Sequence, residues 1–320
     1  MTYEKDKFAN DFAFTSETPY GAASEPTFAG ALSFMRRQYS RDLSKADVAV
    51  LGIPLDTATS NRPGTRFGPQ GVRRASVILC EAPHYPFGFD IFEDLAVVDY
   101  GDCLFDYGRG QEVPDAIYQT AKKVVDSNTF LYSIGGDHFV TYPLLKAHAE
   151  KHGPVALVQF DAHQDTWDDE EERIDHGTMI TRAVKHGLID VDHSIQIGIR
   201  THASQTYGIE IIDAQEMHKL SDEEIAKRIQ DRVAGKNTYL TFDIDCLDPA
   251  FAPGTGTPVC GGLTSAKAVD IMCRLKNIPF VGGDLVEVSP PYDHADITSL
   301  AGATIAQCFL GLLAQRKREA

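Results

Sequence analysis

Short apolar runs alternate with segments of helical pattern along most of the 320-residue chain. Several runs are apolar at nearly every position, which is typical of parallel strands that are covered on both faces. The pattern predicts strands at 48–55, 95–100, 130–136, 155–162, 194–200, 209–213, 238–244 and 280–288. No Ser/Gly-rich linker or internal repeat divides this series. We therefore expect a single α/β domain with a mainly parallel sheet of about eight strands and helices on both faces.

The segments between the runs carry apolar residues at helical spacing. Ser221, followed three residues later by Glu224, is a capping-box signature and predicts that a helix begins there. The predicted helices are 69–80, 114–127, 139–151, 177–187, 221–234, 264–276 and 296–317. The longest apolar stretch, Leu300–Ala314, is interrupted by Thr304 and Gln307, so it predicts a buried helix and not a membrane span.

Residues 1–46 have mixed polarity, interspersed aromatic residues and no clean period. We expect them to form an N-terminal arm that lies over the body or a neighbouring subunit, with the catalytic domain at 47–320. The N-terminus lacks a basic and then apolar signal peptide, and the six cysteines contain no CxxC pair. Reduced thiols and a cytoplasmic location are the simplest expectation.

The chain is acidic, with a formal net charge of −16. This balance argues against a nucleic-acid partner, because neutralising phosphates requires clustered Lys and Arg. It suits a cationic small-molecule substrate, although an acidic enzyme with no such preference would have the same composition.

Three short segments carry the candidate chemistry: GGDH at 135–138, DAHQD at 161–165 and DID at 243–245. Each lies at or just past the end of a predicted strand, where open α/β sheets bind their ligands. Because alternate residues of a strand point the same way, we expect the side chains of the second and third segments to converge. GGDH or DID alone would be read as a turn or a helix N-cap, but an Asp-X-His-X-Asp strand end has no routine structural use.

Together the segments offer four carboxylates and two imidazoles, which is more than one ion requires. The candidate ligands are His138, Asp161, His163, Asp165, Asp243 and Asp245. A donor set rich in oxygen and without thiolate favours two Mn²⁺ ions, with Ni²⁺, Co²⁺ or Fe²⁺ as competitors. The pattern predicts a binuclear metallohydrolase.

These segments, together with IDHGTMI at 174–180, FDIDCLDPAFAPGTGTPVCGGLT at 242–264 and VEVSPPYD at 286–293, resemble the signatures of the ureohydrolases. This is the arginase–agmatinase family, and the agmatinase branch is the most similar. The resemblance runs from about Ala46 to the end of the chain and implies an arginase/deacetylase-like fold. It implies one ion at His138, Asp161, Asp165 and Asp243 and a second at Asp161, His163, Asp243 and Asp245. It also implies a homotrimer or a homohexamer.

The resemblance further implies that Glu287 binds a substrate guanidinium and that His176 shuttles protons. A guanidinium carbon is a poor electrophile, which a hydroxide bridging two ions can attack at neutral pH. Asp165 would pass a proton towards the departing amine, and His176 would exchange protons with solvent. The residues alone leave two other roles open, a structural Arg partner for Glu287 and helix capping by His176.

The stretch 166–175 holds six acidic residues and one Arg and joins Asp165 to His176. An acidic mouth favours agmatine, which would give putrescine and urea, and Asp175 is the candidate substrate contact. A guanidino-acid hydrolase, a guanidine hydrolase and, more remotely, a catalytically silent binding homologue remain as alternatives. Arg62 or Arg66, in a Gly/Pro-rich loop, are further candidates for contact with substrate or with a neighbouring subunit.

Overall fold

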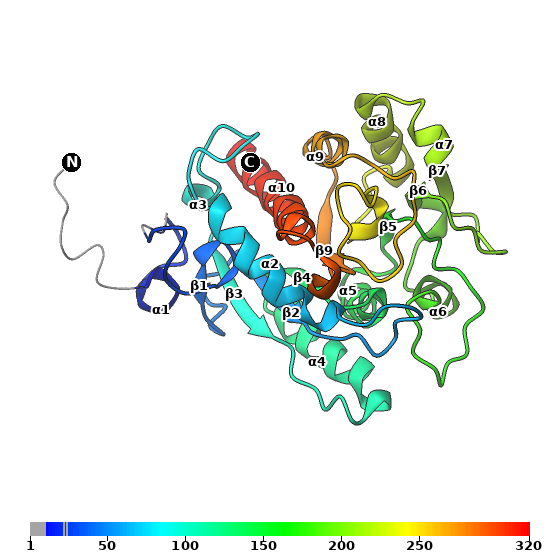
Figure 1. Cartoon of the computed structure of the whole chain (residues 1–320), viewed down its shortest axis with the longest axis horizontal. Helices are drawn as coiled ribbons and strands as arrows, with labels where there is room; N and C mark the ends of the chain where they lie inside the picture. The colour runs from blue at the N-terminus through cyan, green and yellow to red at the C-terminus, as the bar shows by residue number, and fades with distance from the viewer. Residues whose placement is uncertain (1–10, 22, 24) are drawn as a thin grey trace.

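The computed structural model describes residues 11–21, 23 and 25–320. They contain one nine-stranded sheet with the order β1-β3-β2-β4-β9-β8-β5-β6-β7, in which every pair of neighbouring strands is parallel (Figure 1). The strands are β1 (Gln38–Tyr39), β2 (Val48–Ile53), β3 (Val97–Asp102), β4 (Phe130–Gly135), β5 (Ala156–Phe160), β6 (Ile195–Ile199), β7 (Glu210–Asp213), β8 (Thr238–Asp243) and β9 (Phe280–Val286). The parallel α/β fold expected from the sequence is confirmed.

All eight predicted strands are present, and the ninth, β1, was not predicted. It is a two-residue edge strand that pairs with β3, which is too short to leave a periodic pattern. Phe34 and Met35, just before it, are fully buried. The described part of the N-terminal segment therefore packs on the body and extends its sheet.

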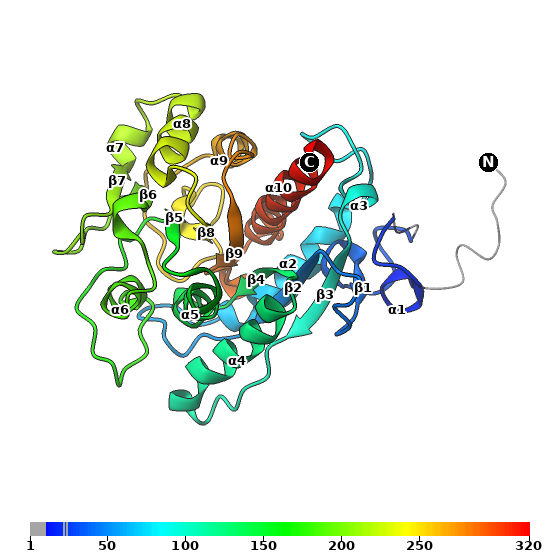
Figure 2. The same ribbon diagram turned by 180° about the vertical axis from the view of Figure 1, so that it is seen from behind.

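Helices cover both faces of the sheet (Figures 1 and 2). One face packs against α2, α8, α9 and α10, and the other against α4, α5 and α6. The α-helices are α1 (Phe12–Thr15), α2 (Gly68–Ser76), α3 (Ile91–Asp94), α4 (Val113–Asp126), α5 (Thr141–His152), α6 (Met179–Lys185), α7 (Ala214–Met217), α8 (Asp222–Val233), α9 (Ser265–Cys273) and α10 (Ile297–Glu319). Short 3₁₀ turns are η2 (Phe34–Arg36), η3 (Thr65–Phe67), η4 (Val77–Leu79), η5 (Gly110–Glu112), η6 (His138–Val140), η7 (Val191–His193), η8 (Ile244–Cys246) and η9 (Pro290–Tyr292).

Strand β2 shows why the runs are apolar at every position. Val48 and Val50 pack into the core on one face of the sheet, whereas Ala49 and Leu51 pack into the core on the other. Both faces are therefore dry, as expected for a parallel sheet between two helix layers.

The seven predicted helices are present, and the capping box of α8 is confirmed. The Ser221 hydroxyl accepts from the Glu224 N–H, and the Glu224 carboxylate accepts from the Ser221 N–H. The four-residue helices α1, α3 and α7 were not predicted, because a single turn gives no periodicity to read.

Among the described residues, α10 is the one helix long and apolar enough to cross a membrane, with a mean hydropathy of 1.7 over its most apolar window. Of that window, 72% is buried inside the protein, where the helix packs against α2 and α9. This burial agrees with the predicted core helix.

His148 of α5 makes the stability of the fold dependent on pH. The ring is fully buried against Tyr239, and burial lowers the pKa of His148 from 6.5 to about 4. Between these values the folded protein binds fewer protons than the unfolded chain, so the free energy of unfolding falls as the pH drops from about 6.5. The loss attributable to this residue reaches about 3 kcal/mol near pH 4.

We expect His148→Gln, which has no titrating ring, to reduce this acid sensitivity. The measurement is urea unfolding of the metal-free protein at pH 7, 6 and 5, with the exposed His202→Gln as the matched control. A wild-type pH dependence retained in the His148→Gln variant would contradict the assignment.

Candidate metal centre

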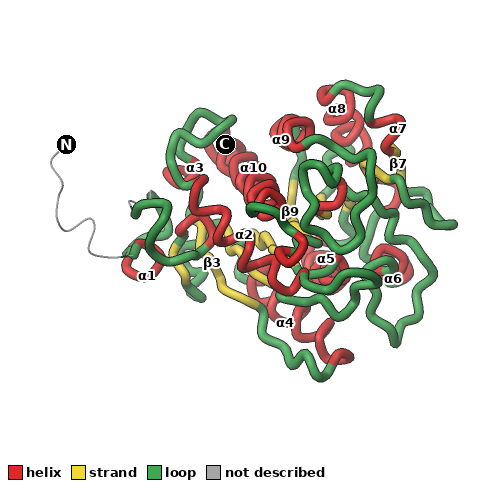
Figure 3. The backbone as a smooth tube through the Cα atoms, viewed as in Figure 1, coloured by secondary structure: helices red, strands yellow, loops and turns green. Residues whose placement is uncertain are grey.

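The carboxyl ends of four neighbouring central strands, β4, β9, β8 and β5, carry the candidate residues. His138 follows β4, Glu287 follows β9, Asp243 is the last residue of β8, and Asp161 follows β5. Because parallel strands all end at the same edge, residues more than 100 positions apart meet there. The long loop between β5 and α6 lies at the same edge, since its residues line one cavity together with His138 and Asp243, and Figure 3 shows long loops around α6.

In the GGDH turn, Gly136 and Asp137 shape the backbone, and this shape positions the candidate ligand His138. A side chain at Gly136 would lie 1.7 Å from the Leu55 carbonyl oxygen, so only glycine allows this close approach. Asp137 caps the following turn by accepting from the Phe139 N–H, and its other oxygen accepts from the Ala58 N–H. The N-cap reading of this Asp is therefore correct, and it places His138 at the start of η6.

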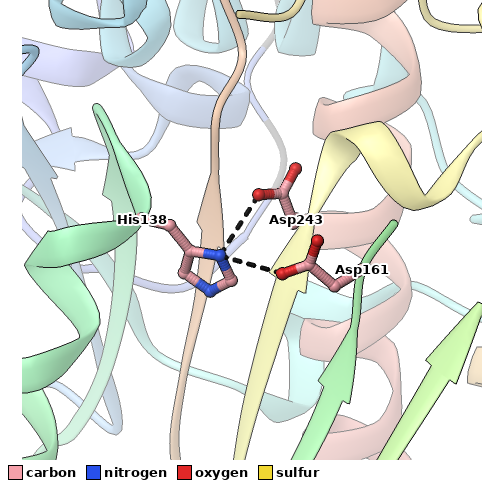
Figure 4. A group of neighbouring side chains, drawn as sticks. All are labelled: His138, Asp161 and Asp243. Atoms are coloured by element: carbon pink, nitrogen blue, oxygen red, sulfur yellow. Dashed lines mark ion pairs between the residues drawn. The ribbon is translucent and has the colours of Figure 1, made fainter. Parts of the chain in front are cut away.

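His138 lies at the centre of three carboxylates. Its Nδ1 is 3.1 Å from Asp161 Oδ2, 2.9 Å from Asp165 Oδ2 and 3.2 Å from Asp243 Oδ2. Figure 4 shows this ring with the Asp161 and Asp243 carboxylates directed towards it from two neighbouring strands. All four side chains are buried.

A second group lies beside the first. His163 Nδ1 is 3.0 Å from Asp245 Oδ2 and 3.5 Å from Asp161 Oδ1. The ligand atoms of Asp161, His163 and Asp245 are within 4.8 Å of one another, as are those of His138, Asp161 and Asp243. Asp161 is thus the carboxylate that the two groups share.

The side chains converge, but the expected reason, alternation along strands, is wrong. Strand β5 ends at Phe160, so the residues from Asp161 to Asp165 form a loop, and Asp165 has a left-handed φ of 52°. Asp245 lies in η8, where the Asp243 carboxylate accepts from the Asp245 N–H at 2.8 Å. A loop and a capped turn therefore aim these carboxylates.

The hydrogen bonds of His138 fit a metal ligand. Its Nε2 is 2.9 Å from Thr241 Oγ1, and the Thr241 hydroxyl donates to Asp284 Oδ1 at 2.5 Å. Thr241 must then accept the Nε2 proton, which leaves the Nδ1 lone pair facing three carboxylates. This buried Nδ1 has no hydrogen-bond partner among the described residues. A neutral ring in this place requires a cation between it and the carboxylates.

The three carboxylates also affect which groups of this cluster hold protons. Burial opposes a charged ring, but the nearby carboxylates of Asp161, Asp165 and Asp243 outweigh it and raise the pKa of His138 well above its usual value. Burial and the Asp161 charge raise the pKa of Asp165 to about 7. The four carboxylates of the candidate ligands therefore carry more negative charge than the two imidazoles can neutralise.

Glu287 is a buried carboxylate with one free oxygen. Its Oε1 accepts from the His138 N–H and from His176 Nδ1, both at 2.8 Å. Its Oε2 is buried without a partner, and the described residues include no arginine paired with it. Like Asp165, Glu287 has a left-handed φ, here 64°, a strained conformation that often marks functional positions.

His176 faces Glu287 and does not cap a helix, since α6 has Thr178 as its N-cap. Burial favours the neutral ring, but the Glu287 charge outweighs it and raises the pKa of His176 to about 9. On the other side of the ring, Nε2 lies 2.7 Å from Ser60 Oγ and 3.0 Å from the Ser60 N–H, a donor that favours the neutral ring. These opposed contacts suit a group that takes up and releases a proton.

These groups border a cavity of about 410 Å³. Its walls are Ser60, His138, His163, Asp165, Trp167, Asp168, Asp175, His176, Gly177, Thr178, Thr201, Asp243 and Thr257. Asp175 is present as expected. Neither candidate arginine lines it, because Arg66 pairs with Asp56 and Arg62 lies over the Tyr292 ring. A more apolar cavity of about 530 Å³ between α9 and α10 contains none of the candidate ligands.

Sequence reasoning missed the residues that hold the ligands in place. Asp284 accepts hydroxyl hydrogen bonds from Thr141, Tyr239 and Thr241, and Thr241 in turn contacts His138. The sequence could have indicated Asp284, because a carboxylate inside the apolar run 280–288 is expected to be buried and then needs hydrogen-bond partners. Ser60 carried no comparable signal.

Comparison with known proteins agrees with this geometry. The family model described as "Arginase family" matches residues 46–311. The agmatinase of Chromobacterium violaceum is 50% identical over 96% of both chains, and that of Proteus mirabilis is 47% identical over 90% of this chain and 94% of the relative.

Two solved structures are also similar. A hypothetical agmatinase from Burkholderia thailandensis has a TM-score of 0.95 and 51% identity over 97% of this chain and 99% of that chain. The proclavaminate amidino hydrolase of Streptomyces clavuligerus has a TM-score of 0.86 and 36% identity over 91% and 100%. The chain therefore belongs to the arginase family and is a ureohydrolase of the agmatinase branch.

Proposed function

We propose that this protein hydrolyses agmatine to putrescine and urea with two bound Mn²⁺ ions. The observation that carries the proposal is the pair of His–carboxylate groups that share Asp161, next to a buried Glu287 with one free oxygen. The agmatinases among its relatives support agmatine as the substrate.

Six residues would hold the ions. His138, Asp161, Asp165 and Asp243 would bind one, and Asp161, His163, Asp243 and Asp245 would bind the other. The oxygen-rich donor set favours Mn²⁺, although availability also influences which metal is bound. When bound, two divalent ions supply a nucleophile from water at neutral pH and positive charge for the developing tetrahedral centre.

Glu287 would orient the guanidinium. Its Oε1 is held by His138 and His176, which leaves Oε2 to accept from the planar fork of guanidinium N–H donors. The oriented substrate would then present its central carbon to the nucleophile.

His176 and Asp165 would move the protons that the reaction requires. Expulsion of the alkylamine requires a proton, and Asp165, which lines the cavity beside the other proposed ligands, would pass one towards that amine. His176 lines the same cavity and would exchange protons between this group and solvent.

We also propose that the enzyme is a cytoplasmic homotrimer or homohexamer in which the N-terminal segment contacts a neighbouring subunit. The Phe14 and Phe28 side chains in that segment are 68% and 91% exposed, which suits such a contact. Sedimentation of wild type and of Phe28→Ser would test this, and a wild-type monomer would contradict it.

The substrate is tested by urea release from the Mn²⁺-loaded protein with agmatine, 4-guanidinobutyrate, 3-guanidinopropionate, arginine and guanidine. A strong preference for agmatine is the expected result. Preference for a guanidino acid or for guanidine would still support hydrolysis of a guanidino compound but would contradict agmatine as the substrate.

Glu287→Gln keeps the shape of the side chain but removes its charge. We expect kcat/KM for agmatine to fall roughly 100-fold, because a charge-assisted contact to the guanidinium is lost. Metal content by mass spectrometry is the control and should stay as in wild type. Full activity in this variant would exclude the guanidinium contact.

A further inference from the structure

The charge of the catalytic cavity comes from few side chains outside the metal group. None of its lining residues is Lys or Arg, and loop 166–175 supplies two carboxylates, Asp168 and Asp175. Next to His176 lies a third, Glu287, with its buried free oxygen. This lining favours a ligand with positive charge and offers no Lys or Arg side chain to a carboxylate.

Two acidic side chains of loop 166–175 form pairs that stabilise the conformation of the loop. The side chain of Asp169 is fully buried and pairs with Arg182 Nη2 at 2.6 Å, which ties the loop to α6. Glu171 accepts from His186 at 2.8 Å. Neither side chain lines the cavity, so both contribute little to ligand selection.

Asp175, the candidate from the sequence, has both oxygens engaged. Oδ1 accepts from the Gly177 N–H at 2.9 Å, and Oδ2 pairs with Arg173 at 2.9 Å. Binding a substrate amine through Asp175 would therefore require competition with Arg173. Asp175 shapes the turn before His176.

Asp168 differs from Asp175 in this respect. It lines the cavity, is exposed to solvent, and has no ion-pair partner among the described residues. Of the two carboxylates that the loop presents to the cavity, it is the one without an ion-pair partner among the described residues.

Trp167, the only tryptophan of the chain, lines the cavity next to Asp168. Its backbone N–H donates to the Gly177 carbonyl at 3.2 Å, and a Cβ on Gly177 would lie 3.3 Å from the Cε3 atom of the indole ring. The ring is therefore held against the backbone beside His176. An indole beside an unpaired carboxylate is a typical arrangement for an alkylammonium group.

We propose that Asp168, supported by Trp167, binds the ammonium at the far end of the substrate and selects a diamine-like guanidine over a guanidino acid. This inference rests on the proposed function and deepens it. A substrate bound in the cavity would shield the Asp168 carboxylate from water. The contact between its ammonium and Asp168 would therefore be stronger than an ion pair on an open surface.

The test compares Asp168→Asn with the matched control Glu172→Gln, which removes one charge from an exposed position of the same loop that does not line the cavity. The substrates are agmatine and N-butylguanidine, which has the same guanidine and chain length but no amine. We expect Asp168→Asn to lower kcat/KM for agmatine about 10-fold, mainly through KM, and to leave N-butylguanidine hydrolysis unchanged. Glu172→Gln should behave as wild type with both.

A second readout does not depend on turnover. Putrescine should raise the Tm of the Mn²⁺-loaded wild type and of Glu172→Gln, and less so that of Asp168→Asn. If wild type prefers agmatine but Asp168→Asn and Glu172→Gln behave alike, the proposed ammonium subsite is wrong and the proposed function stands. A wild type that hydrolyses another guanidine and not agmatine would overturn the proposed function and the subsite with it.

Discussion

Asp161→Ala should bind neither ion and lose roughly 10³-fold or more in kcat/KM, because several kcal/mol of transition-state charge stabilisation disappear with the metals. Asp161 belongs to both groups, since its Oδ2 is 3.1 Å from His138 Nδ1 and its Oδ1 is 3.5 Å from His163 Nδ1. Its removal would take one ligand from each of the two proposed ions. The measurements are metal content per chain by mass spectrometry and urea release.

Asp245→Ala is the comparison that separates the two ions. Asp245 lies 3.0 Å from His163 and belongs to the second group only. We expect this variant to retain about one ion per chain, whereas Asp161→Ala retains none. Two ions per chain in Asp245→Ala would refute the ligand assignment. Circular dichroism of both variants checks that the fold survives.

His176→Asn should reduce kcat by about 10²–10⁴-fold, which is the range for a lost proton-transfer group. Asn can still donate to Glu287 but cannot exchange protons near neutrality. Metal content should not change, because the His176 ring hydrogen-bonds to Glu287 and Ser60 and to none of the six proposed ligands.

Two further measurements separate proton transfer from positioning at His176. Added imidazole should partly restore the activity of His176→Asn if the missing function is proton exchange. Ser60→Ala removes the hydroxyl near Nε2 but keeps the backbone N–H, so we expect a smaller loss from it. Unchanged activity in His176→Asn would rule out the shuttle role.

The six candidate ligands could be proposed from sequence because their residue types and spacing are rare outside metal sites. The geometry behind them could not. Asp165 and Glu287 have left-handed backbone conformations that no strand pattern predicts, and Asp245 lies in a 3₁₀ turn. Such conformations are set by loop contacts, for example the bond from the Glu287 N–H to the Gly136 carbonyl.

The neighbours of the ligands were also beyond sequence reasoning. The chain of hydrogen bonds from Asp284 in β9 through Thr241 in β8 to His138 after β4 joins three segments that are distant in sequence. In loop 166–175, composition predicted an acidic mouth, but it could not tell paired from unpaired carboxylates. Arg182 pairs with Asp169 and Arg173 with Asp175, which leaves Asp168 free of both.

The sequence by itself determined the strands, the longer helices, the α/β class and the chemical character of the site. These features depend on near neighbours along the chain, where the hydrophobic period and the capping residues act. The tertiary structure alone decided the strand order that places β4, β9, β8 and β5 side by side, and with it which charges are offset and which oxygen of Glu287 is free. Contacts between segments far apart in sequence set those outcomes, and no local pattern encodes them.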